Sequence, residues 1–494
     1  MTQTSVQHER TPATVARDRR SLRLYPLLIA AGIGTAMLTT RLWGITHSLW
    51  WDEAYTAWAY ITRPGAIRDP DRYLGNNHVL FSWLSHHTTE LAGSTWEPII
   101  RFWSVFPGLI ATAVLTVWLW RRVSPALALT TLGVLYVSVA HARHIPEARG
   151  YGLVLLGSVV LIAAGSAASE DRPSWLADAS FAIGGAVGIA AIPTLAFAAI
   201  PQGGAALVCR QHHRVRLLTG GAMAAGLLAV WYWPLRAPML HYRTPVGSRS
   251  GDPVTPTNFL TLPVDHLVAG PLATMLPGLP AGAVLMVAFG LTAAGIVQLL
   301  RTQRAVGVQV LVGLVGSMIV IGLVGVHAQP RYLFFLLPHA AIALSSGLVW
   351  AATALADHLP PRAARSVVML LVALALLRGT AEVMEVRQTP RQAFADSVEA
   401  ILESDVETLY TDRLHIGYRW YLGPRADEVI TIDRTELAEV VCGADGSAAY
   451  LPYPRSDTYP DALVCFGDPE WTIVDPASTH PTPVWIRRAS EGQG

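Results

Sequence analysis

The sequence contains no lysine: all 36 residues of the Lys-plus-Arg count in this 494-residue chain are arginines. Charged residues make up only 14% of the chain and hydrophobic residues 52%, whereas average soluble domains carry roughly 25% charge. This composition excludes a largely disordered chain, because disorder needs high charge and low hydrophobicity. The formal net charge of +1 also gives no basic footprint for nucleic-acid binding.

Several sequence motifs are absent as well. The chain has no P-loop, no Rossmann fingerprint, no HExxH and no paired CxxC, so nothing predicts nucleotide binding or zinc-protease chemistry. Cysteine is scarce, with only Cys209, Cys442 and Cys465. The last two lie in the polar C-terminal part and could form a disulfide if that part is outside the cytoplasm.

What is abundant is long apolar runs, each near the roughly 17–25 residues that cross a bilayer. They predict an α-helical polytopic membrane protein of about eleven spans. The candidate spans are 24–40, 99–120, 124–141, 150–168, 174–192, 193–209, 217–235, 278–300, 305–326, 332–355 and 366–380. Arginine clusters fall in alternate connections, at 121–122, 172, 210–216, 301–304 and 362–365. By the positive-inside rule these connections are cytoplasmic, as is the N-terminus, in a plasma (inner) membrane.

One placement depends on that rule. The uncharged stretch between Asp178 and Arg210 contains Pro193 and Pro201 and could be one over-long span or a hairpin of two short ones. A single span would put Arg210 and every later cluster outside. Two spans keep all the clusters inside, and we therefore expect the hairpin and an outside C-terminus.

This topology divides the chain into three parts. Residues 1–20 are expected to form a disordered cytoplasmic tail. Residues 21–380 form the transmembrane domain, with a large first outer loop at 45–98. Residues 381–494 form a small extracytoplasmic α/β domain, with a helix at Arg391–Ser404. Its expected strands are Glu407–Thr411, Val429–Ile432, Ala448–Pro452, Trp471–Val474 and Val484–Ile486.

The first candidate site follows the first span, where Asp52 and Glu53 come directly after Trp50 and Trp51. Tyr55 follows two residues after Glu53. Tryptophans hold such a segment at the membrane interface. A carboxylate at this depth could act as a base towards a lipid-linked substrate. It could equally cap a short interfacial helix.

A second polar group follows in the same loop, with Asn77, His78, His86 and His87. These side chains could bind sugar hydroxyls or a metal ion. They could also belong to an amphipathic helix that begins near His78. Adjacent histidines such as His86 and His87 are poorly spaced for shared metal ligation on a helix.

Two short outer turns carry further polar residues. The turn at 142–149 contains His144, Glu147 and Arg149, and the other contains Arg331 and Tyr332. Arg331 suits bidentate phosphate binding, although a snorkelling interface arginine is the alternative. An Arg149–Glu147 pair that anchors helix ends is likewise open. All these groups fall on one face in the topology, which predicts a polar cavity there.

The combination resembles the GT-C glycosyltransferases. The residues that carry this likeness are the Asp-Glu pair, the Asn-Asn-His-x-Leu segment, the Glu-x-Arg-x-Tyr turn and the late Arg-Tyr-Leu. More narrowly, they look like the branch of protein O-mannosyltransferases, aminoarabinose transferases and actinobacterial cell-envelope sugar transferases. The resemblance covers roughly residues 20–380.

The resemblance implies residue roles. Asp52 matches the general base, and Glu53 would position it or the acceptor. Arg331, with Tyr332 and Arg149, would bind the donor phosphate. Asn77, His78, Glu147, His144 and Tyr55 would line the substrate site. No cofactor is implied as obligatory, a divalent cation is an alternative, and its ligands stay undetermined because the second outer turn offers Glu147 rather than an aspartate.

The resemblance also implies a reaction. Such enzymes move a sugar, here mannose or arabinose, from a polyprenyl-phosphate donor to a glycolipid, polysaccharide or protein acceptor with inversion on the outer membrane face. The partners are then membrane lipids, that donor and that acceptor, and no nucleic acid. A lipid-linked-sugar flippase or transporter and a non-catalytic envelope assembly factor are the alternatives.

Overall fold

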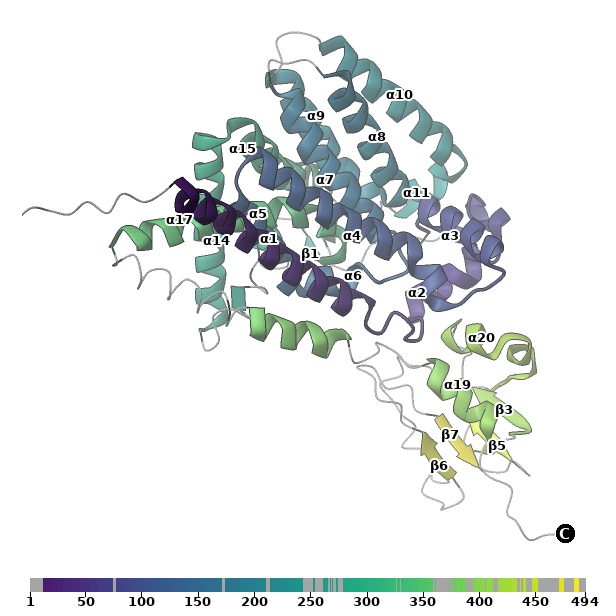
Figure 1. Cartoon of the computed structure of the whole chain (residues 1–494). Coiled ribbons are helices and arrows are strands. Elements are labelled where there is room, and N and C mark those ends of the chain that lie inside the picture. Colours follow the sequence, from purple (N-terminus) through teal and green to yellow (C-terminus); the bar gives the residue numbers. More distant parts are fainter. Residues whose placement is uncertain are drawn as a thin grey trace, which may run out of the picture.

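The structure is a computed structural model of the 494-residue chain. The residues it describes are 12–73, 77–170, 174–209, 214–242, 252–253, 261–264, 267, 269, 272–273, 279–325, 327–328, 330–358, 360, 373, 376–387, 394–404, 406–411, 416–432, 436, 439–440, 447–451, 471–474 and 484–487. Helices make up most of this structure and gather in one bundle, with a small sheet beside it (Figure 1).

The bundle is built from helices of very different length. Its α-helices are α1 (Pro12–Leu42), α2 (Trp51–Thr56), α3 (Val79–Ala92), α4 (Glu97–Arg122), α5 (Pro125–Val137), α6 (Val139–His144), α7 (Tyr151–Ala168), α8 (Trp175–Ala191), α9 (Ala196–Cys209), α10 (Arg214–Tyr232), α11 (Arg236–Tyr242), α12 (Thr261–Val264), α14 (Ala281–Thr302), α15 (Arg304–Leu311), α16 (Ser317–Val324) and α17 (Leu337–His358). Short 3₁₀ or π segments join them: η1 (Ala57–Ile61), η2 (Pro64–Ala66), η3 (Pro70–Arg72), η4 (Pro193–Leu195), η5 (Trp233–Leu235), η7 (Val312–Gly316) and η8 (Pro330–Leu336). Strands β1 (Asp252–Pro253) and β2 (His327–Ala328) pair antiparallel.

The helices confirm a multi-pass membrane protein. Among the described residues, 6 helices are long and apolar enough to cross a bilayer, and four shorter apolar helices accompany them. Together they coincide with the first ten predicted spans. The eleventh, 366–380, lies largely outside the described residues. A helix over 376–387 includes its end and packs on α5, where the Tyr136 and Thr380 hydroxyls are 2.7 Å apart.

The predicted hairpin between Asp178 and Arg210 is present. Helix α8 ends at Ala191, the backbone of the next residue, Ile192, is extended (φ −142°, ψ 117°), and η4 turns the chain into α9. A Cβ on Gly203 would lie 3.5 Å from the Phe181 ring, and one on Gly185 would lie 4.0 Å from Ala199 Cβ. The residue number rises along α9 as it falls along α8, so the two helices are antiparallel.

Small residues let the central helices approach closely, as is common between transmembrane helices. A Cβ on Gly157 of α7 would lie 2.8 Å from the Gly184 carbonyl oxygen of α8. A Cβ on Gly152 would lie 1.7 Å from the Ser104 carbonyl oxygen of α4. Helix α7 is therefore held between α4 and α8, and it has the site described below at its first residue.

Helix α7 separates the connection at 121–122 from the turn at 142–149. At its far end Glu170 forms an ion pair with Arg122 at the end of α4. An 18-residue helix is about 27 Å long. The arginine-rich connection at 121–122 and the turn at 142–149 are therefore on opposite sides of the bundle, as the charge pattern predicts.

The C-terminal segment forms a five-stranded sheet in the order β4-β3-β5-β7-β6. The strands are β3 (Thr408–Thr411), β4 (Ile430–Thr431), β5 (Ala448–Tyr450), β6 (Trp471–Val474) and β7 (Val484–Arg487), close to the five predicted ones. Strands β4, β3 and β5 are parallel, and β7 pairs antiparallel with β5 and β6. Helices α19 (Phe394–Glu403) and α20 (Ile416–Leu422), followed by η9 (Gly423–Glu428), share a hydrophobic core with the sheet.

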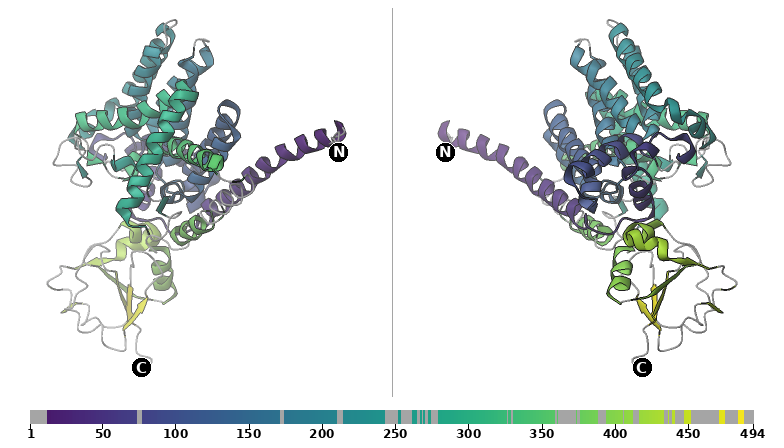
Figure 2. Two further views of the ribbon diagram at one scale, coloured as in Figure 1. Left: turned by 90° about the vertical axis from the view of Figure 1, so that its left-hand side faces the viewer. Right: turned by 90° about the vertical axis from the view of Figure 1, so that its right-hand side faces the viewer.

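The sheet lies below the helical bundle in both views of Figure 2, with α20 next to α2 (Figure 1). The Tyr421 hydroxyl of α20 accepts a hydrogen bond from the Leu49 amide (2.6 Å) and donates one to Glu97 Oε1 (3.0 Å). This segment therefore contacts the loop at 45–98 directly.

One expectation for the N-terminus was wrong. Residues 12–20 were expected to be disordered, but they form the start of α1, which extends away from the bundle (Figure 2). Alanine, leucine and arginine favour a helix, and residues 13–25 contain neither glycine nor proline. Residues 1–11, Cys442 and Cys465 lie outside the described residues, so the tail before Pro12 and the disulfide stay predictions.

Candidate active site

Asp52 lies in the first turn of α2 and is only 2% exposed. Its Oδ2 accepts a hydrogen bond from Arg149 Nη1 at 2.6 Å and one from Arg331 Nη1 at 2.9 Å. The three residues come from separate parts of the chain: the loop at 45–98, the turn before α7 and the segment before α17. Because a buried charge is costly unless it is paired, this contact fixes the relative position of the three segments.

Arg149 is held in place from several sides. Its Nε donates to His78 Nε2 at 3.0 Å. Its guanidinium lies over the rings of Trp50 and Tyr151, 5.7 and 5.8 Å from their centroids. The next residue, Gly150, has a φ of +72°, where glycine is favoured, and it lets the turn enter α7 abruptly.

His78 acts as a neutral acceptor. Burial lowers its pKa well below the usual value, and the charges of Arg149 and Arg331 lower it further. A neutral ring whose Nε2 accepts from Arg149 carries its proton on Nδ1, and His78 also forms a hydrogen bond with the backbone of Ala191. His78 therefore orients Arg149 without adding a charge.

Arg331 is the accessible member of the group, with 29% of its side chain exposed, whereas Asp52 and Arg149 are almost fully buried. Its Cζ lies 5.4 Å from the centroid of the Tyr332 ring. Its Nε is buried and has no hydrogen-bond partner within the described structure, so the exposed part of the guanidinium is the part open to a ligand. Arg331 can therefore bind a second anion beside Asp52.

Glu53 differs from Asp52 although the two are adjacent. Arg101 donates to both of its oxygens, at 3.0 and 2.8 Å. The Ala148 amide donates to Oε1 at 2.6 Å and the Trp50 amide to Oε2 at 3.1 Å. The contact with the Trp50 amide caps the N-terminus of α2, which was the alternative role considered for this acidic pair. Glu53 thus connects α2, α4 and the 142–149 turn and is positioned for support rather than for reaction.

Of the other predicted residues, His144, Glu147 and Tyr332 have contacts next to the Asp52 group. His144 and Glu147 are both buried, with Nδ1 and Oε2 3.2 Å apart, and His144 packs against Tyr151 and Phe334 next to the Asp52 group. Tyr332 adjoins Arg331, as described above.

Asn77 and Tyr55 have contacts in another part of the loop. The Asn77 amide donates to the Ile67 carbonyl at 2.6 Å. Tyr55 packs against Tyr60 and Trp58. Asn77 therefore stabilises the turn around η2, while Tyr55 belongs to an aromatic cluster. Asn76 lies outside the described residues.

One supporting residue was missed at the level of sequence. Arg101 is buried in the first turns of α4, where it also donates to the carbonyls of Ile45 and His47 at 2.6 and 2.8 Å. A signal was available, because Arg101 is a lone charge in the apolar run 99–120. Such a charge marks a functional or paired position in a membrane helix.

No protein-family model and no curated protein sequence matches this chain. Among solved structures, ArnT from Cupriavidus metallidurans in the apo state is similar, with a TM-score of 0.56 and 14% identity. The match covers 96% of this chain and 100% of that one. The same protein bound to undecaprenyl phosphate matches with a TM-score of 0.51 and 14% identity, over 95% of this chain and 99% of that one. ArnT has the GT-C fold.

The chain has the GT-C fold. Within this GT-C bundle, Asp52 follows the first membrane helix, Arg149 precedes α7 and Arg331 precedes α17. The polar groups thus gather where three helices begin or end on the same side. The arrangement combines a carboxylate with cationic groups, of which one is accessible, and this set can hold an anion next to a proton acceptor.

Proposed function

We propose that the protein is a membrane glycosyltransferase that transfers a sugar from a polyprenyl-phosphate donor to a cell-envelope acceptor. The observation that carries the proposal is the contact of Asp52 with both Arg149 and Arg331, the latter 279 residues away in sequence. The GT-C fold supports it, and so does the undecaprenyl phosphate bound to the similar ArnT.

In this proposal Arg331 binds the donor phosphate, with Tyr332 and Arg149 beside it. An arginine fork suits phosphate oxygens, and a fixed positive charge stabilises the leaving phosphate as its negative charge grows. Arg331 is suited to this role because 29% of its side chain is exposed, whereas Asp52 and Arg149 are almost fully buried. Arg149 is buried and keeps the Asp52 carboxylate in position.

Asp52 is the proposed general base. The acceptor hydroxyl oxygen attacks the anomeric carbon from the face opposite the phosphate, and its proton passes to the Asp52 carboxylate. The bond between the anomeric carbon and the phosphate oxygen breaks, and polyprenyl phosphate leaves with the electron pair. The sugar is thereby transferred with inversion. A positioned base of this kind contributes about 10²–10⁴-fold in rate.

The finer features of the proposal follow from the sequence. We propose an outer-face reaction, with a cytoplasmic N-terminus and an extracytoplasmic C-terminal segment. The transferred group is a hexose or pentose, with mannose and arabinose favoured. The acceptor is a glycolipid, a polysaccharide or a protein. His78, His144 and Glu147 would line the substrate side, and Glu53 would support the site through Arg101.

The decisive experiment compares Asp52→Asn with Asp71→Asn in full-length protein in nanodiscs. Asp71 is an exposed aspartate of the same loop, so its variant makes the same chemical change away from the site. With radiolabelled polyprenyl-phosphate sugars and membrane extract as acceptor, Asp52→Asn should lower kcat by about 10²–10⁴-fold, and Asp71→Asn should match wild type. Turnover retained in Asp52→Asn would remove the proposed base. A folded wild type that transfers from no donor would overturn the transferase itself.

A second variant in the same assay addresses the phosphate. Arg331→Lys keeps the charge but loses the fork, so the KM for the donor should rise roughly tenfold, as for one lost charge-assisted hydrogen bond. An unchanged KM would show that Arg331 does not bind the donor.

A further inference from the structure

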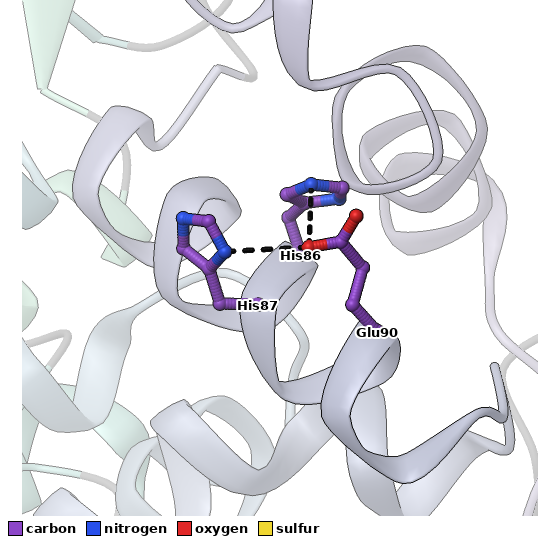
Figure 3. Close-up of side chains that lie close together, drawn as sticks. All are labelled: His86, His87 and Glu90. Carbon is purple, nitrogen blue, oxygen red and sulfur yellow. Dashed lines mark ion pairs between the residues drawn. The ribbon is translucent and has the colours of Figure 1, made fainter.

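A second polar cluster lies on α3, apart from the Asp52 group. His86, His87 and Glu90 have their ligand atoms within 4.8 Å of one another. His86 Nε2 and His87 Nδ1 approach the same oxygen of Glu90, Oε2, at 3.3 and 3.4 Å (Figure 3). Three donor atoms of the kinds that bind transition metals therefore converge at one point.

The contact between His86 Nε2 and Glu90 Oε2 needs a positive charge between the two atoms. His86 Nδ1 lies 2.7 Å from the Ile61 carbonyl oxygen, and because a carbonyl only accepts, Nδ1 carries the proton. In a neutral ring Nε2 then presents a lone pair, and it faces the lone pairs of the Glu90 carboxylate. The lone pairs repel each other, whereas a cation between the two atoms would attract both.

The distances suit a metal ion. Zinc binds histidine nitrogen and carboxylate oxygen at about 2.0–2.2 Å in tetrahedral sites, so neighbouring ligand atoms are roughly 3.3 Å apart. The separations of 3.3 and 3.4 Å from Glu90 Oε2 to His86 Nε2 and His87 Nδ1 have this length. A proton between nitrogen and oxygen would draw the two atoms closer, to about 2.7–2.9 Å.

The adjacency of His86 and His87 does not prevent this geometry. His86 offers its distal Nε2 and His87 its proximal Nδ1, and both rings lean towards Glu90 one helical turn later (Figure 3). Adjacent histidines on a helix can share one ion when they use different ring nitrogens, and His86 and His87 present Nε2 and Nδ1 respectively.

We propose that His86, His87 and Glu90 bind a divalent transition-metal ion, with Zn²⁺ as the expected occupant. Two imidazoles and one carboxylate leave a position for water. His86 is the buried anchor, while the side chains of His87 and Glu90 are 51% and 62% exposed and open to solvent. The Nδ1 contact to Ile61 is the outer hydrogen bond that typically orients a ligating histidine.

The proposed ion would join two parts of the first outer loop. Ile61 is the last residue of η1, which continues directly from α2, the helix that carries Asp52. A metal on His86 strengthens its Nδ1–H as a donor and thereby ties α3 to the α2–η1 segment. The expected role is to stabilise this loop, and it is independent of the sugar-transfer proposal.

The test uses tag-free, chelator-treated, full-length protein in detergent and Zn²⁺ alone as the probe. His87→Ala and Glu90→Gln remove exposed ligands and leave buried His86 in place. His358→Ala and Asp357→Asn change an exposed histidine and an exposed aspartate on α17 and serve as matched controls. Wild type should bind one equivalent of Zn²⁺ at pH 7.5 and unfold at a higher temperature with it. The two ligand variants should bind at least ~10-fold more weakly, since even outer partners of metal ligands matter by 10–100-fold.

A spectroscopic readout separates this site from any other. Co²⁺ in a four- or five-coordinate site gives visible d–d bands, which should appear in wild type and in the controls but not in His87→Ala. Wild-type protein that binds no stoichiometric Zn²⁺ would overturn the proposal. Equal affinity in wild type and both ligand variants would overturn it as well.

Discussion

At the scale of single residues, the neighbouring carboxylates of Asp52 and Glu53 differ in whether their partners are accessible to solvent. Asp52 contacts Arg331, whose side chain reaches solvent, while Glu53 is enclosed by Arg101 and two backbone amides. A carboxylate with an accessible partner can take part in binding and reaction. One whose oxygens are filled by four fixed donors acts through structure, because any change leaves buried donors without an acceptor.

This contrast gives a prediction for Glu53. Glu53→Gln leaves the Arg101 charge buried without its counter-charge, which costs about 3–5 kcal/mol in comparable cases. We expect a large fall in the thermal unfolding temperature in detergent. The double variant Glu53→Gln/Arg101→Gln should recover part of the loss, since both charges are removed. Wild-type stability of the single variant would contradict the supporting role.

His78 predicts how stability depends on pH. The folded protein holds His78 neutral because burial and two arginines lower its pKa, whereas the unfolded chain protonates it near its ordinary value of about 6.5. Unfolding therefore takes up a proton below that pH, and stability falls as the pH drops, by up to ~1.4 kcal/mol per unit from this residue.

The measurement compares the unfolding temperatures of wild type and His78→Gln between pH 7.5 and 5.5. Glutamine keeps an acceptor for Arg149 but does not titrate, so its profile should be flatter. Some dependence of stability on pH should persist in the variant, because His47 also has a lowered pKa. Its burial is the main cause, and the charges of Arg387 and Arg101 add to it. Equal slopes in the two proteins would exclude His78 as the titrating group.

At the scale of elements, the position of the site depends on how α7 packs. The helix begins right after Arg149 and Gly150, and its second residue, Gly152, lies against the backbone of α4. Because transmembrane helices associate through close packing, the approach of α4 to α7 sets where the Arg149 guanidinium lies. The close packing of α4 and α7 requires glycine at position 152, next to the site.

The corresponding prediction concerns Gly152→Ala. The new Cβ would lie 1.7 Å from the Ser104 carbonyl oxygen, so α4 and α7 must separate, at a cost of about 1–3 kcal/mol for an overpacked core. Sugar transfer should fall along with stability. Gly290→Ala in α14 is the matched control, since nothing lies within 4 Å of its Cβ. A Gly152→Ala protein equal to this control would contradict the packing argument.

At the scale of the whole molecule, the C-terminal segment and the bundle meet at the loop that carries Asp52. Besides the Tyr421 contacts, the Ala395 amide donates to the Ser48 hydroxyl at 3.2 Å, and Arg419 Cζ lies 5.8 Å from the centroid of the Trp58 ring. These contacts flank α2 on both sides. The C-terminal segment therefore helps to hold the Asp52 helix.

Tyr421→Phe tests this coupling. Burial raises the Tyr421 pKa, so the hydroxyl stays protonated and donates to Glu97 while accepting from Leu49. The phenylalanine loses both hydrogen bonds and leaves the Leu49 amide without its acceptor. Amide hydrogen exchange over residues 48–56 should become about tenfold faster, equivalent to roughly 1.4 kcal/mol of local stability. Exchange unchanged from wild type would show that the contact does not stabilise the loop.

Much of this architecture could be predicted from the sequence. The spans, the hairpin at Pro193 and the five short strands follow from hydropathy, charge and alternation, which act locally along the chain. The gathering of Asp52, Arg149 and Arg331 on one face followed from topology alone. The pairing of Glu53 with Arg101 could not be predicted, because Arg101 lies in another helix and no local sequence pattern indicates which buried charges pair.

The sequence by itself thus determined a many-helix membrane protein with its polar turns on one side, because a bilayer admits few alternatives for long apolar runs. Only the tertiary structure decided which of two adjacent acidic residues contacts an accessible arginine, and that His86 and His87 share Glu90. Those outcomes depend on distances of a few ångströms between side chains, and such distances are set by packing between helices and by the need to pair every buried charge.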